Sequence, residues 1–201
     1  MRMKILVGLL SLAMGFASAA VGWDPPGQLS PASTPSQKAK DAANKAAQEA
    51  QRAARNAADA ANAAADRAKA NAGMISTALA EGIRHAAQRA AESARRFEAK
   101  ASESAALALD AGKEAADAAL AEAKKATKAT EEALQRAGDA ARLAGQSTQE
   151  EAEKAALRTR AALQIAVEAT RRSVQAARDA AAKAIEATHG AESHAPSSPG
   201  K

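Results

Sequence analysis

The sequence contains no cysteine and no tyrosine, and its 201 residues include only two phenylalanines and one tryptophan. Without cysteine the chain has no disulfide framework, no thiolate nucleophile and no thiolate metal ligand. The aromatic side chains are too few to form a stacking platform for single-stranded nucleic acid. These absences exclude disulfide-stapled folds, thiol enzymes and aromatic nucleic-acid binders.

Large apolar side chains are also scarce. Residues 38–188 hold sixteen of them, and residues 48–73 hold none. Each one contributes roughly 1.5–3 kcal/mol when fully buried, whereas ordering a residue costs about 1–2 kcal/mol in backbone entropy. The chain contains instead 65 alanines, and alanine is the strongest helix former. The composition therefore predicts helix throughout and no globular core.

The charge pattern does not indicate a nucleic-acid partner. The formal net charge is +5, but acids and bases alternate along the chain and form no one-sided basic field of the kind that binds nucleic acid. Opposite charges recur at helical spacing and should support an exposed helix by roughly 0.2–0.5 kcal/mol per pair. These pairs are Asp41/Lys45, Glu92/Arg96, Lys113/Asp117, Glu132/Arg136, Glu150/Lys154 and Asp179/Lys183.

No arrangement of catalytic or ligand-binding residues is present in the sequence. The histidines are His85, His189 and His194, and the last two lie in a predicted tail with no third fixed ligand for a metal. There is no phosphate-binding glycine motif and no HExxH. Adjacent acids such as Glu131 and Glu132 stand on an exposed helix, where nothing excludes water. We expect no enzyme activity, no cofactor, no metal and no small-molecule substrate.

Four segments follow from local composition. Residues 1–19 have a basic start, an apolar centre and a small-residue cleavage pattern, which predicts a signal peptide cleaved after about Ala19 and hence secretion. Its removal would lower the net charge to about +3. Residues 20–37 are rich in proline and serine and read as an extended arm, with Ser36 as the N-cap of the next helix. Residues 38–188 form the alanine-rich region, and residues 189–201 form a disordered tail.

An apolar stripe recurs along the alanine-rich region. Small or apolar residues occupy positions 1, 5, 9 and often 2 of an eleven-residue unit that begins at Ala42, and at 3.67 residues per turn this stripe stays on one side of a helix. A seven-residue frame fits the alanines from Ala39 to Ala64 but loses phase at Arg67, so the eleven-residue frame is preferred. The candidate interaction stripe comprises Ala53, Ala64, Ile75, Leu79, Ile83, Ala90, Phe97, Ala101, Ala108, Ala119, Leu134, Leu163, Val167, Val174 and Ile185.

The predicted fold is all-α: a long, extended alanine-rich amphipathic helix or helical hairpin with eleven-residue (hendecad) repeats and no globular core. Breaks are possible near residues 71–76 and near 145–148, where Gly145 precedes a capping-box pattern at Ser147–Glu150. Gly112 reads as a tolerated glycine within the helix. The all-alanine part before Gly73 should be the least firmly docked, because a methyl group contributes roughly 0.8 kcal/mol when buried.

The repeat allows several roles. Segments such as 39–61 and 118–145 resemble the group 3 late embryogenesis abundant proteins, and this resemblance implies a stress protectant that coats membrane or protein surfaces as water is lost. The alanine content resembles the coiled-coil silks of bees and ants, which implies self-association along the seam. Thr148, Thr159 and Thr170 recur every eleven residues and resemble the ice face of type I fish antifreeze proteins. Exchangeable lipid binding uses similar repeats. The expected partners are a second copy or transient surfaces, and not nucleic acid.

Overall fold

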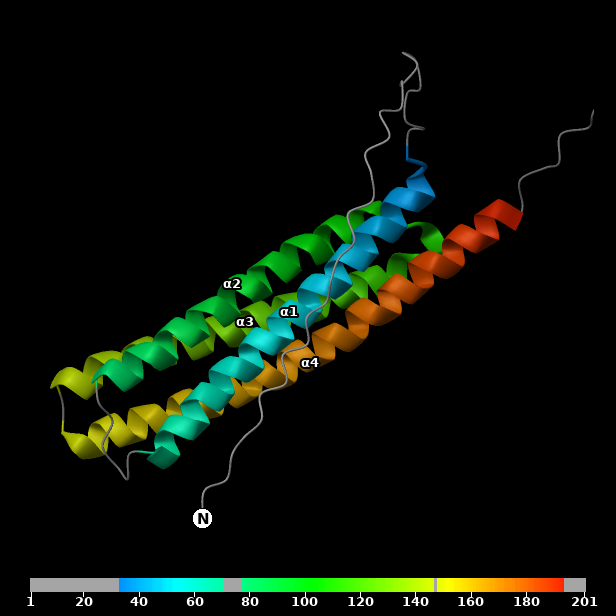
Figure 1. Cartoon of the computed structure of the whole chain (residues 1–201). Helices are drawn as coiled ribbons and strands as arrows, with labels where there is room; N and C mark the ends of the chain where they lie inside the picture. The colour runs from blue at the N-terminus through cyan, green and yellow to red at the C-terminus, as the bar shows by residue number, and fades with distance from the viewer. Residues whose placement is uncertain (1–32, 71–76, 147, 194–201) are drawn as a thin grey trace, which may run out of the picture. The chain divides into compact units, whose positions relative to one another are not determined.

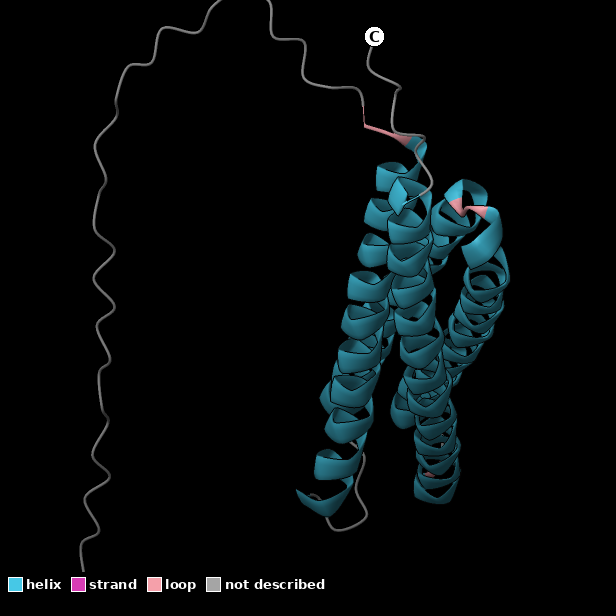
Figure 2. Ribbon diagram, turned by 90° about the vertical axis from the view of Figure 1, so that its right-hand side faces the viewer, coloured by secondary structure: helices cyan, strands magenta, loops and turns pink. Residues whose placement is uncertain are grey.

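A computed structural model describes residues 33–70, 77–146 and 148–193. They form four α-helices: α1 (Pro35–Ala70), α2 (Thr77–Leu107), α3 (Asp110–Gln146) and α4 (Gln149–Ser193). These described residues contain no strand (Figure 2). The predicted signal peptide, most of the predicted arm and the break near 71–76 lie outside the described residues. Helix α1 ends before that break and helix α2 begins after it.

The four helices lie side by side, and each runs antiparallel to the next (Figure 1). Helix α1 packs on α2, α2 on α3, α3 on α4 and α4 on α1, whereas the diagonal pairs barely touch. The all-α prediction is confirmed. The predictions of an extended helix and of no core are wrong, because the stripes of the four helices face one another and form a common interior.

Helix α1 begins at Pro35 and is capped by Thr34, two residues before the predicted cap Ser36. The Thr34 hydroxyl accepts a hydrogen bond from the Gln37 backbone N–H at 3.3 Å, and Lys38 N–H donates to the Thr34 carbonyl at 3.0 Å. Proline favours the first helical position because it has no N–H that needs a partner and its φ is already helical. The helix therefore includes three residues that were assigned to the arm.

Helix α4 begins with a reciprocal capping box between Thr148 and Glu151. The Glu151 N–H donates to the Thr148 hydroxyl at 3.4 Å, and the Thr148 N–H donates to the Glu151 carboxylate at 3.3 Å. This box lies one residue later than the Ser147–Glu150 pattern expected from the sequence. It satisfies two backbone donors at the helix start, where the chain reverses after Gln146. At its other end α4 continues to Ser193, into the predicted tail.

The reversal between α2 and α3 at Ala108 and Leu109 was missed. No proline or glycine marks these two residues, so they carry none of the usual turn signals. The turn is closed by a hydrogen bond from Gly112 N–H to the Leu109 carbonyl at 2.8 Å, and Lys113 Nζ donates to the Ala105 carbonyl at 2.6 Å. Gly112 faces α4 in the first turn of α3, and a Cβ there would lie 3.8 Å from the Ala184 backbone nitrogen, which is an ordinary contact distance.

Burial follows a seven-residue period within α1, α2 and α3, and the eleven-residue row that begins at Ala42 is also buried or half-buried wherever the structure describes it. Buried residues alternate at three- and four-residue spacing, as in coiled-coil bundles, and the phase resets at each turn. The buried rows are Ala39, Ala43, Ala46, Ala50, Ala53, Ala57, Ala60 and Ala64 in α1; Ala80, Ile83, Ala87, Ala90, Ala94, Phe97, Ala101 and Ser104 in α2; and Gly112, Ala116, Ala119, Ala123, Ala126, Thr130, Ala133, Ala137 and Ala140 in α3.

The interior is built mainly from alanine. Phe97 and Leu163 are the largest fully buried side chains among the described residues, and each is surrounded by alanines from neighbouring helices. Small side chains let helix backbones approach closely, so packing contacts replace part of the missing apolar area. The alanines of α1 are as deeply buried as any others: Ala53 and Ala57 are both 0% exposed. Nothing in the packing marks this stretch as the least firmly docked.

Candidate interaction surfaces

The predicted stripe forms the inner faces of the four helices rather than an outer surface. Its fully buried members are Ala53, Ala64, Ile83, Ala90, Phe97, Ala101, Ala119 and Leu163. Its half-buried members are Leu79, Ala108, Leu134, Val167, Val174 and Ile185, and Ile75 lies outside the described residues. In the folded bundle no external partner can reach this surface without separating the helices.

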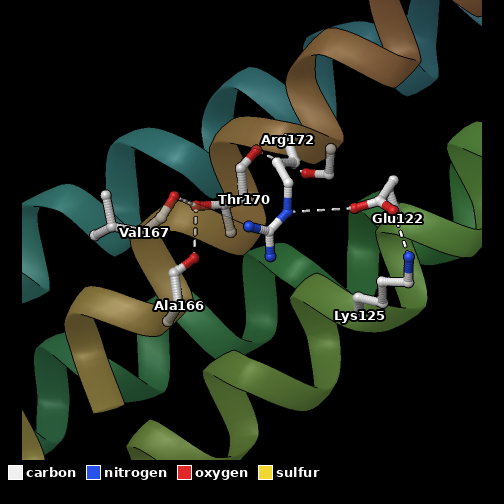
Figure 3. A network of polar contacts seen from close by, with 7 residues as sticks. Glu122, Lys125, Ala166, Val167, Thr170 and Arg172 are labelled. Atoms are coloured by element: carbon white, nitrogen blue, oxygen red, sulfur yellow. Dashed lines mark hydrogen bonds and ion pairs between the residues drawn. The ribbon is translucent and has the colours of Figure 1, made fainter. Parts of the chain in front are cut away.

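Several buried hydroxyl groups of the alanine interior donate hydrogen bonds, whereas the buried Thr127 Oγ1 has no partner among the described residues. Thr170 Oγ1 donates to the Ala166 carbonyl at 2.9 Å, and Thr130 Oγ1 donates to the Ala126 carbonyl at 2.9 Å (Figure 3 shows the first). Such bonds to the preceding turn allow a small polar side chain to be buried at low cost. Thr159 and Thr170 are 1% and 0% exposed, so two of the three threonines proposed as an ice face are not accessible.

Besides the Lys113 contact at the turn, further polar contacts join neighbouring helices. Asn56 of α1 donates to the Ser93 hydroxyl of α2. The Arg95 guanidinium of α2 pairs with the Glu131 carboxylate of α3 at 2.8 Å. Between α3 and α4, Thr159 Oγ1 donates to the Arg136 carbonyl at 3.0 Å and Arg172 Nε lies 3.8 Å from Glu122 Oε2 (Figure 3). Together these contacts link α1 to α2, α2 to α3 and α3 to α4.

Most other charged groups form exposed pairs within one helix. The predicted pairs Lys113/Asp117, Glu132/Arg136 and Glu150/Lys154 have N–O distances of 3.5, 3.7 and 2.6 Å. Lys183 pairs with Glu186 rather than with the predicted Asp179, and the hydrogen bond that Lys183 donates to this carboxylate raises the pKa of Lys183. The hydrogen bond from Lys100 likewise lowers the pKa of Glu103. These exposed pairs support the helices and contribute little each.

The outer surface has one apolar feature that the sequence analysis did not single out. Leu157 and Ile165 of α4 are 61% and 62% exposed although both are large apolar residues. Beside them a groove of about 860 Å³ runs between α1 and α4. Alanines of α1, among them Ala58, Ala61 and Ala65, line its other wall. Leu157 and Ile165 lie eight residues apart on one face of α4, with the exposed Ala161 midway between them.

Within residues 33–70, 77–146 and 148–193 no three histidine or acidic side chains gather closely enough to hold a metal ion. None of the four described helices has an apolar stretch long enough to cross a membrane. His85 is exposed on α2, His189 lies near the end of α4, and His194 is not described.

The fold and these surfaces define a four-helix, alanine-packed protein with two candidate interaction surfaces, one inside the bundle and one outside. Comparison of the chain with protein-family models, with curated proteins and with solved structures gives no match.

Proposed function

We propose that this protein is a secreted, non-catalytic protectant whose helices open from the bundle and coat membrane or protein surfaces when water is scarce. The observation that carries the proposal is the composition of the interior. Apart from Phe97, Leu163 and Ile83, its buried apolar side chains are alanines. Separating the helices exposes mainly methyl groups, each worth roughly 0.8 kcal/mol, against up to ~3 kcal/mol for a leucine or phenylalanine. A lipid or protein surface can cover the same stripes again.

The geometry favours one way of opening. Helices α1 and α2 form one antiparallel pair and α3 and α4 form another, and Ala108 and Leu109 join the two pairs. Rotation about these two residues would separate the pairs while each helix stays intact. The contact between Arg95 of α2 and Glu131 of α3 crosses the junction at 2.8 Å, so a covalent link there would hold the bundle closed.

A cleavable cross-link tests the proposal, since the chain has no cysteine of its own. The double variant Arg95→Cys/Glu131→Cys is joined by a bifunctional maleimide with an internal disulfide, and dye-filled vesicles are dried with it and rehydrated. The linked protein should lose the dye retention that the unmodified chain gives, and reduction of the linker should restore it. Lys100→Cys/Glu103→Cys carries the same linker within α2 alone and should protect throughout. Equal protection by the locked bundle would refute opening.

The second candidate is a structural protein that self-associates along the seam, as alanine-rich coiled coils do. The observation that favours it is the seven-residue spacing of the buried alanines, because a helix with this spacing can pair with helices of another chain as well as its own. Such assembly requires exchange of helices between chains. It predicts large, open-ended assemblies in sedimentation at high concentration, whereas the protectant stays a small species.

A further inference from the structure

The outward face of α4 carries a row of exposed residues whose order is symmetric about its centre. Going along the helix, the row reads acid, base, leucine, alanine, isoleucine, acid, base. Its spacing is four, three, four, four, three, four residues, so at 100° per residue all seven side chains lie within about an 80° arc. We call this row the α4 outer stripe: Glu150, Lys154, Leu157, Ala161, Ile165, Glu168 and Arg172.

We propose that the α4 outer stripe binds a second copy of this chain in an antiparallel α4–α4 contact centred on Ala161. A twofold axis at Ala161 places each residue opposite the one equally far from the centre on the other helix. Leu157 then meets Ile165 of the second copy, and Lys154 meets its Glu168. Glu150 meets its Arg172. Every charge faces an opposite charge and every apolar residue faces another, twice each by symmetry.

The charges of the stripe are available for this pairing. Lys154 and Glu168 are 61% and 62% exposed and otherwise pair within α4, at 2.6 Å to Glu150 and 3.5 Å to Arg171. Exposed pairs of this kind are weak and exchange readily. Arg172 directs Nε toward Glu122 (Figure 3), and a guanidinium has four further N–H donors that can reach a second carboxylate.

The shape of the α4 outer stripe and its apolar area also favour a second copy of this chain as the partner. The methyl group of Ala161 at the axis lets the two helix backbones approach closely, and the stripe extends over about 33 Å of helix at 1.5 Å per residue. The groove between α1 and α4 lies along the stripe, which gives the second copy room beside the helix. Covering Leu157 and Ile165 removes the two most exposed large apolar side chains of the described residues from water.

Parallel pairing would bring like charges together, since each residue would then meet its own counterpart. Lys154 would face Lys154 and Arg172 would face Arg172, which is repulsive at every charged position. Charge order therefore selects the antiparallel orientation, and apolar contact at the centre supplies most of the affinity.

Charge exchange tests the pairing by sedimentation equilibrium of the full chain. The unmodified chain should show a monomer–dimer equilibrium that weakens as salt is raised. Lys154→Glu turns two attractive contacts per dimer into repulsive ones and should weaken association about tenfold or more. The double variant Lys154→Glu/Glu168→Lys should restore the association constant to near that of the unmodified chain. Lys128→Glu makes the same charge change on the exposed face of α3 and should leave association unchanged.

The double variant separates pairing between chains from effects within α4. Within α4 the double variant places like charges beside Glu150 and beside Arg171. If the charges acted only through the stability of α4, the double variant would therefore associate more weakly than the single variant. Restored association therefore supports contact between chains. A second readout fixes the orientation: Ala161→Cys should form a disulfide-linked dimer under mild oxidation and Glu150→Cys should not, whereas parallel helices would link both. A chain that stays monomeric at every concentration, or a double variant that does not recover, overturns the proposal.

Discussion

Replacing Phe97 with alanine should destabilise a packed bundle but stabilise an extended helix, so the sign of the change in stability distinguishes the two structures. Phe97 is fully buried where all four helices meet, against Ala50 and Ala53 of α1, Ala123 of α3 and Ala177 of α4. Truncating such a side chain leaves a cavity and costs roughly 3–5 kcal/mol. In an isolated helix the same change would be favourable by about 0.5 kcal/mol, because alanine has the higher helix propensity.

Thermal unfolding followed by circular dichroism measures this difference. For a chain of this size each kcal/mol shifts Tm by about 2–4 °C, so Phe97→Ala should lower Tm by roughly 6–20 °C. Leu157→Ala is the matched control, because Leu157 is 61% exposed and should change stability by less than about 0.5 kcal/mol in dilute protein. An unchanged or raised Tm for Phe97→Ala would refute the four-helix interior. Equal losses in the two variants would show that Phe97 is no more buried than Leu157.

Three further outcomes follow from single sites. Gly112→Ala should keep or raise Tm in thermal unfolding, since its Cβ meets α4 at ordinary contact distance and alanine favours helix by about 1 kcal/mol, whereas Gly112→Leu should lower it. Thr159→Val should cost about 1–2 kcal/mol in urea unfolding, because the hydrogen bond from Thr159 Oγ1 to the Arg136 carbonyl, which joins α4 to α3, is lost. Lys100→Ala should raise the pKa of Glu103 toward its ordinary value in an NMR titration, since the Lys100 hydrogen bond lowers that pKa. The stabilising effect of that pair is present at neutral pH and should fade as pH falls through the pKa of Glu103.

The helices and their apolar faces were predictable because both depend on local order. Alanine favours helix at every position, and the residues that face inward recur at helical spacing whatever covers them. Ala53, Ile83, Phe97 and Leu163 were all placed on the stripe from the sequence, and all are buried. The start of α1 was also readable, since Thr34-Pro35 and Gln37 form a capping signal that was passed over in favour of Ser36.

The turn at Ala108 and Leu109 could not be found in the same way. These two residues resemble their helical neighbours in composition, and the glycine that serves the turn comes only at Gly112. Each turn also shifts the phase of the seven-residue pattern, so a single seven-residue frame along the whole chain fails although each helix is regular. The outward position of Leu157 and Ile165 was equally hidden, because a large apolar residue is expected inside until the neighbours of its helix are known.

The sequence by itself determined that the chain is helical and which side of each helix is apolar, since propensity and periodicity act within a few turns. Only the tertiary structure decided what covers that side. An alanine methyl group is removed from water equally well by another helix of the same chain, by a second chain or by a lipid surface, so local pattern does not distinguish them. The choice depends on close approach of segments far apart in sequence, such as Gly112 against Ala184 or Phe97 against Ala53, and on the turns that bring them together.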